Sequence, residues 1–154
     1  MQRNSVSKLR MVAAPFLIVG GLLMSACPVL ADSDDKPCSN RTLRGDYGYT
    51  AEGSLLPAPG VSLSFRSIGM TRFDGRGNIA WLEHTVINGV SLETGWTAST
   101  GSYALNSDCT GTAVINTPNS PVPLHLHIIV VKDGREMRSV LDDNAVSSVF
   151  SKVE

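Results

Sequence analysis

The chain has 154 residues, 13 of them basic and 14 acidic, and a formal net charge of −1. A chain of this length accommodates one domain with a single moderate core. Because the basic residues form no dense run or stripe, the composition argues against the clustered phosphate contacts on which nucleic-acid binding depends. We therefore predict one small domain without a nucleic-acid partner.

Residues 1–31 have the organisation of a secretory signal peptide. Lys8 and Arg10 precede an apolar run over 11–24, and small residues lead up to Ala31. A basic start, a short apolar run and a small-residue exit are typical of a cleaved leader. We predict cleavage after Ala31, which leaves ten basic and 14 acidic residues and a net charge of about −4. No later apolar stretch approaches the roughly 20 residues that cross a bilayer, so we predict no transmembrane segment in the mature chain.

A second interpretation of this leader stays open. The segment Leu23-Met24-Ser25-Ala26-Cys27 resembles a bacterial lipobox, in which the cysteine is acylated and becomes the mature N-terminus. Met24 stands where leucine is usual, and we favour ordinary cleavage. Both interpretations predict export to the periplasm or the extracellular space, the second with a lipid anchor on Cys27.

Both interpretations also leave the same pair of cysteines, Cys38 and Cys109, in the exported domain. Free thiols are hard to maintain in an oxidising compartment, so we predict a disulfide between them. A closed loop of some 70 residues stabilises a fold by roughly 4 kcal/mol on the chain-entropy model. Residues 32–37 are acidic and lack apolar side chains, which predicts a flexible lead-in to a domain over 38–154.

From Gly45 onward the sequence is a series of short strands. Runs with period-2 alternation or many β-branched residues are separated by Gly, Asn, Asp and Pro, and helical periodicity is absent. The expected strands lie at 45–53, 62–73, 78–87, 90–94, 96–105, 110–116, 123–132, 135–142 and 145–152.

The connections between these strands have the chemistry of hairpin turns. Asp74-Gly75-Arg76-Gly77-Asn78, Asn88-Gly89 and Asp133-Gly134 offer residues that adopt a positive φ at low cost. Consecutive hairpins predict an all-β fold, a single antiparallel up-and-down meander of about eight strands that closes into a barrel. A two-sheet β-sandwich is the alternative. The two prolines in 55–60 predict a longer loop that folds over one mouth of the barrel.

Three stretches of the sequence resemble a known group of proteins. They are Cys38-Ser39-Asn40 with Leu43-Arg44-Gly45-Asp46-Tyr47-Gly48-Tyr49, then Phe73-Asp74-Gly75-Arg76-Gly77-Asn78-Ile79, and the run from Gly101 to Thr112. Together they resemble small exported bacterial proteins with a lipocalin-like or allene-oxide-cyclase-like β-barrel, over most of residues 38–150. The resemblance implies a fold; it implies no catalytic residue.

The interior of such a barrel is the predicted binding site for a small hydrophobic or amphipathic ligand. Trp81 and Trp96 are candidates to line a cavity, and Arg66, His84 and Arg138 are candidates to orient a charged group of the ligand. Further cavity candidates are Tyr47, Tyr49, Phe65 and Met70. The competing interpretation is that the aromatic residues fill the core and the arginines face solvent.

We predict neither a metal nor a cofactor. His125 and His127 share one face of a strand, and His84 or Glu83 would have to supply a third ligand from another strand. The flanking leucines favour a core-facing alternation with the imidazoles on a wetter face.

The motifs leave enzymatic activity open but favour a binding function. A strained Gly-x-Ser-x-Gly elbow for a nucleophilic serine is absent. We predict a ligand-binding barrel, or one that docks an envelope partner. The alternatives are a cyclase or isomerase of the allene-oxide-cyclase type, which shapes its substrate in a cavity, and a structural or adhesive surface protein with a packed barrel.

Overall fold

The structure is a computed structural model that describes residues 36–154. The predicted leader, its cleavage after Ala31 and the acylation of Cys27 concern residues outside that range. In the described part, nine strands follow one another, with two short 3-10 helices. The helices are η1 (Asn40–Thr42) and η2 (Lys132–Gly134); the strands are β1 (Arg44–Ala58), β2 (Val61–Asp74), β3 (Asn78–Ile87), β4 (Val90–Ser91), β5 (Thr97–Leu105), β6 (Thr110–Asn116), β7 (Leu124–Val131), β8 (Glu136–Leu141) and β9 (Ala145–Lys152).

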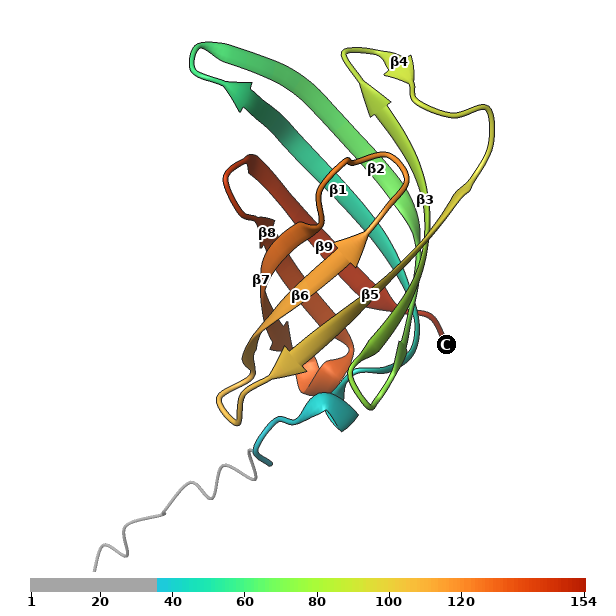
Figure 1. The fold of residues 1–154 in the computed structure, drawn as a ribbon. Helices are drawn as coiled ribbons and strands as arrows, with labels where there is room; N and C mark the ends of the chain where they lie inside the picture. Colours follow the sequence, from blue (N-terminus) through green and yellow to red (C-terminus); the bar gives the residue numbers. More distant parts are fainter. Residues whose placement is uncertain (1–35) are drawn as a thin grey trace, which may run out of the picture. The chain divides into compact units, whose positions relative to one another are not determined.

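The strands form one antiparallel sheet that closes on itself (Figure 1). Its order is β2-β1-β9-β8-β7-β6-β5-β3-β4, and β2 also pairs with β3, which completes a barrel of eight strands with β4 as an extra strand. Closure satisfies the backbone groups that the outermost strands of an open sheet would expose. The predicted all-β meander and its closure into a barrel are confirmed, and the two-sheet sandwich is not found.

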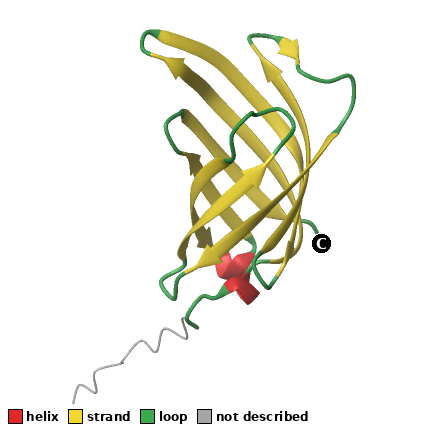
Figure 2. Ribbon diagram, in the orientation of Figure 1, coloured by secondary structure: helices red, strands yellow, loops and turns green. Residues whose placement is uncertain are grey.

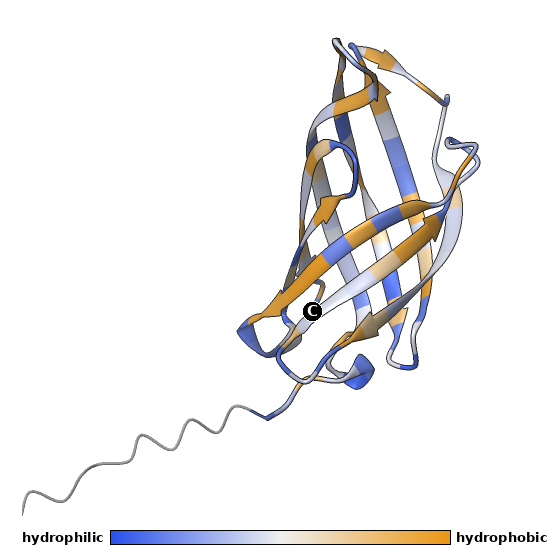
Figure 3. Cartoon of the chain, turned by 60° about the vertical axis from the view of Figure 1, so that its left-hand side comes forward, coloured by the Kyte–Doolittle hydropathy of each residue, from blue (hydrophilic) through white to orange (hydrophobic). Residues whose placement is uncertain are grey.

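Buried and exposed residues alternate along the long strands, most regularly in β3 and β7. Figure 3 shows that the hydropathy also changes repeatedly along the strands. Half of the barrel is filled by aromatic rings that meet edge to face. The ring centroids of Tyr47 and Phe73 are 5.2 Å apart, and those of Phe73 and Tyr103 are 5.1 Å apart. Leu43 and Phe150 are completely buried beside them. This half of the interior is a packed aromatic core.

One end of the barrel, which we call the closed end, carries both short helices (Figure 2). The Tyr103 hydroxyl donates to the carbonyl oxygens of Asn40 and Leu43, at 2.8 and 2.9 Å. The Tyr47 hydroxyl donates to the carbonyl oxygen of Gly134. Because these tyrosines reach out from the packed core, the helices are fixed across the end of the barrel.

The predicted disulfide between Cys38 and Cys109 is present beside η1. The two Cα atoms are 5.0 Å apart and the cysteines are separated by 71 residues. The Cys38 N–H also donates to the carbonyl oxygen of Ser107, at 3.0 Å. The disulfide therefore ties the start of the barrel domain to the β5–β6 turn at the closed end.

The β1–β2 hairpin corrects one expectation. Residues 55–60, predicted to be a loop over the mouth, instead continue β1 and turn at Pro59-Gly60, so that the hairpin projects past the end of β9 and beyond its pairing with β3 (Figure 1). A register shift between Leu55 and Ala58 accommodates Pro57, because a bulge on an edge does not need the missing N–H. We call the end that carries this hairpin the open end.

Asparagine side chains cap both edges of the projecting hairpin. Pairing with β9 stops at Ser54, and the N–H of Leu56 donates to Asn144 Oδ1 at 2.9 Å. Pairing with β3 stops at Phe65, and the N–H of Ser64 donates to Asn88 Oδ1 at 2.8 Å. None of the helices in residues 36–154 is long and apolar enough to cross a membrane.

Candidate functional site

A small cavity lies inside the barrel, in the half toward the open end. It is half-enclosed and has a volume of about 40 Å³. Its apolar walls come from six strands, with the side chains of Ala51, Phe65, Ile115, Leu124, Leu126, Leu141 and Val146. Its polar wall is formed by Ser67, Glu83 and Ser148, beside Tyr49 and Trp81. The cavity is therefore a cup with apolar sides and a polar patch on one wall.

The alternation of β3 directs a carboxylate into this cup. Ile79, Trp81, Glu83 and Thr85 share one face of the strand and are all buried, whereas Leu82 faces outward and is exposed. Glu83 is only 7% exposed although it carries an ionisable group. A position that alternation would give to an apolar residue is thus occupied by a carboxylate.

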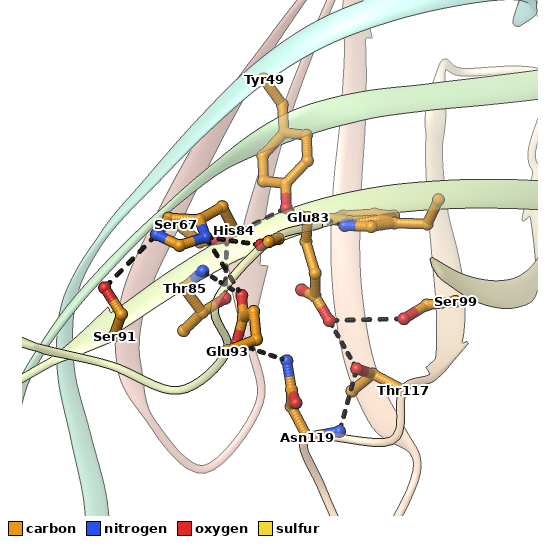
Figure 4. A network of polar contacts seen from close by, with 12 residues as sticks. Tyr49, Ser67, Glu83, His84, Thr85, Ser91, Glu93, Ser99, Thr117 and Asn119 are labelled. Atoms are coloured by element: carbon orange, nitrogen blue, oxygen red, sulfur yellow. Dashed lines mark hydrogen bonds and ion pairs between the residues drawn. The ribbon is translucent and has the colours of Figure 1, made fainter. Parts of the chain in front are cut away.

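Two hydroxyl groups hold the Glu83 carboxylate by the same oxygen (Figure 4). Thr117 Oγ1 donates to Glu83 Oε1 at 2.5 Å, and Ser99 Oγ donates to it at 3.3 Å. Thr117 belongs to the β6–β7 loop, where its Oγ1 also accepts the N–H of Asn119 at 3.2 Å. Within residues 36–154 no hydrogen bond reaches Oε2 and no ion pair includes Glu83, so one carboxylate oxygen is free.

A second polar group borders the cup at Tyr49. The indole N–H of Trp81 donates to the Tyr49 hydroxyl at 2.8 Å, and this hydroxyl lies 3.0 Å from Ser67 Oγ. Thr85 Oγ1 in turn donates to Ser67 Oγ at 3.1 Å. Burial raises the pKa of Tyr49 well above its ordinary value, and its hydrogen bonds oppose the rise only in part. Tyr49 is therefore a neutral hydrogen-bonding group.

The segment between β3 and β5 is attached to the barrel wall by Glu93. Glu93 Oε1 accepts the backbone N–H of Thr85 at 2.7 Å, in the place of a strand neighbour. Its other oxygen accepts from Asn119 Nδ2 at 3.4 Å, and His84 Nδ1 lies 3.7 Å from Oε1. The predicted strand 90–94 is accordingly reduced to β4, because the chain turns at Leu92 to bring Glu93 under β3.

The five predicted ligand-binding residues do not come together in one site. Trp81 is buried against the cup, but Arg66 faces outward, with its Nε 3.6 Å from Glu52 Oε2. Arg138 also faces outward and pairs with Glu136 at 2.8 Å. Both arginines lie on the outer face, so they do not line the interior. Contact between them and a ligand stays a prediction that concerns the outer surface only.

The other two, His84 and Trp96, are neighbours outside the barrel. Their ring centroids are 6.1 Å apart, and His84 Nδ1 lies 2.8 Å from the carbonyl oxygen of Gly95. Trp96 is 57% exposed and borders a shallow outer hollow of about 470 Å³ together with Met70. Both Trp96 and Met70, expected as cavity residues, thus lie on the outer surface.

The histidines are spread over the outer surface. His125 and His127 both face outward on β7, and His127 Nδ1 lies 2.8 Å from Asp142 Oδ1. Glu83 points inward and cannot join them. No group of three or more His, Cys, Asp or Glu side chains placed to hold a metal occurs among residues 36–154.

Comparisons with protein families, with curated protein sequences and with solved structures found no match for this chain. The class of protein is therefore defined by its own geometry, as a closed eight-stranded antiparallel barrel with a packed closed end and a small polar-walled cup.

Proposed function

We propose that this protein is an exported, disulfide-bonded β-barrel that binds a small amphipathic molecule at its open end. The single observation that supports binding is the half-enclosed cup, in which apolar walls adjoin a buried carboxylate with a free oxygen. Ligand sites typically combine mostly apolar walls with a few placed polar groups. Export is supported by the disulfide, since such bonds persist in oxidising compartments.

The size of the cup limits what it can take. Its volume of about 40 Å³ is well above the ~15 Å³ that one water molecule needs and far below the ~300 Å³ at the lower end of drug-sized pockets. A head group or a very small molecule fits, and a larger apolar body would extend toward the open end. The same small volume favours the second candidate function, a structural or adhesive barrel whose interior is filled by side chains.

Mass spectrometry of protein purified from its own cell envelope tests the binding function. We expect an additional mass under native conditions that is lost on denaturation. Ala51→Leu places a larger side chain in the cup and should remove this mass, whereas Thr50→Leu, on the outer face of the same strand, should retain it. A bare chain in all native spectra would favour the structural barrel. Activity of the cyclase or isomerase type stays a prediction.

A further inference from the structure

We propose that the cup selects ligands with a cationic head group, a primary or methylated ammonium on an apolar body. Glu83 supplies the opposite charge from the polar wall. This inference rests on the proposed binding function and adds the chemical class of the ligand.

The first argument is the state of the Glu83 carboxylate. Its Oε1 accepts from Ser99 and Thr117, and no hydrogen bond from residues 36–154 reaches its Oε2. The side chain lines the cavity, and the residue is only 7% exposed. A buried carboxylate is costly unless it is paired and hydrogen-bonded. The free oxygen is therefore a vacant acceptor inside the cup.

The second argument is that the described barrel offers Glu83 no positive charge. The ion pairs of residues 36–154 all lie on other acidic groups, and Arg66 and Arg138 point outward to Glu52 and Glu136. The side chains that line the cup are apolar or neutral, apart from Glu83 itself. Residues 36–154 therefore supply no cation for this carboxylate, and in our proposal a bound molecule does so.

The third argument is the aromatic lining. Tyr49, Trp81 and Phe65 all line the same cavity, and the ring centroids of Tyr49 and Trp81 are 4.6 Å apart. The faces of aromatic rings attract cations and repel anions. The rings and the carboxylate thus favour the same sign of charge. The cavity volume of about 40 Å³ suits an ammonium or methylammonium group, while Leu124 and Val146 offer apolar surface to the rest of the ligand.

Three probes with one chain length separate charge from apolar contact: n-hexylammonium, n-hexanol and n-hexanoate. Binding is measured by calorimetry and by the fluorescence of Trp81, in a Trp96→Phe background that removes the exposed tryptophan. We expect n-hexylammonium to bind at least about tenfold more tightly than n-hexanol, since a hydrogen bond between two charged groups is stronger than one from a neutral hydroxyl. We expect n-hexanoate to bind most weakly.

Glu83→Gln keeps an acceptor for Ser99 and Thr117 and removes the charge. It should lower the affinity for n-hexylammonium to that for n-hexanol and leave n-hexanol unchanged. Glu52→Gln, the same exchange on the outer face, should alter neither affinity. Equal binding of the ammonium and the alcohol to the unmodified Glu83 site would overturn the charge selection and leave the binding function standing. Failure of all three probes, with no ligand mass in the native protein, would overturn both.

Discussion

Trp81 on β3 and Tyr49 on β1 meet inside the barrel across the intervening strand β2. The indole N–H donates to the Tyr49 hydroxyl at 2.8 Å, and the two ring centroids are 4.6 Å apart. The contact is possible because Gly69 of β2 lies between them without a side chain. A Cβ atom built on Gly69 would lie 2.8 Å from Tyr49 Cε1. The contact between Tyr49 and Trp81 beside the cup therefore depends on the missing side chain at Gly69 as much as on the hydrogen bond.

The Tyr49 hydroxyl should contribute measurably to stability. Tyr49→Phe leaves the buried indole N–H of Trp81 without its acceptor, which typically costs about 1–3 kcal/mol in the free energy of unfolding. Urea denaturation should show this loss, with Thr50→Ala on the outer face within about 0.5 kcal/mol of the parent protein. Identical midpoints for Tyr49→Phe and the parent protein would contradict the assigned role.

Two glycines of neighbouring strands provide a matched test of packing. A Cβ on Gly69 would lie 1.9 Å from the carbonyl oxygen of Leu82, whereas one on Gly48 would meet only Met70 Sδ, at 3.9 Å. We expect Gly69→Ala to destabilise the barrel by about 1–3 kcal/mol or more, as overpacking does. Gly48→Ala should be neutral or stabilising, because it restricts the unfolded chain without a clash. Equal thermal midpoints for the two variants would refute the close approach at Gly69.

Loss of the disulfide should weaken the whole domain. The double variant Cys38→Ser, Cys109→Ser should lose about 2–5 kcal/mol in the free energy of unfolding, as small exported domains do when a native disulfide is removed. A reducing agent should lower the urea midpoint of the parent protein and leave that of the double variant unchanged. The expected contribution would be contradicted if the urea midpoint of the parent protein did not change after complete reduction, verified by counting the thiols.

The β2–β3 turn predicts an acid-sensitive step in stability. The Asn78 side chain and the backbone N–H groups of Asn78 and Arg76 donate to the Asp74 carboxylate and lower its pKa from 3.8 to about 2. Because the pKa is lower in the folded state, the stabilisation is present above 3.8 and is lost as the pH falls through about 2.

Asp74→Asn removes this titration and retains an acceptor for the turn. The parent protein should have the higher thermal midpoint at neutral pH, and the difference should shrink between pH 3.8 and about 2. Asp46→Asn, on the exposed face of β1, is a control without a turn contact. A difference in midpoint that does not change over this interval would argue against the lowered pKa of Asp74.

Most of the fold could be predicted because strand alternation and turn chemistry agree. Asn88-Gly89 and Asp133-Gly134, predicted as turns, do adopt positive φ values, of 50° and 80° in the first pair and of 54° and 81° in the second. The prediction of a loop over 55–60 is wrong, because β1 continues to Ala58 through Pro57. The register between β1 and β2 shifts between Leu55 and Ala58, and such an irregularity tolerates Pro57, which has no N–H.

The site was harder to predict because several inward residues are polar. Arg66 and Arg138 each directly precede a buried serine, Ser67 and Ser139, and small hydroxyl side chains in the interior hide which face is inward. From the sequence alone Glu83 is only a candidate third ligand of a metal site. Glu83 lies two residues after Trp81 and four after Ile79, so strand alternation puts it on the same inward face as these two apolar residues. The contribution of Thr117 comes from a loop, where alternation gives no signal.

The asparagine caps on the projecting hairpin bear on how the protein behaves at high concentration. Past Ser54 and Phe65, β1 and β2 pair only with each other, and the outer edge of each can recruit an extended segment from another molecule. Asn144 accepts the N–H of Leu56 on one edge, and Asn88 accepts the N–H of Ser64 on the other. The hairpin can therefore extend beyond the barrel wall without acting as a template for aggregation.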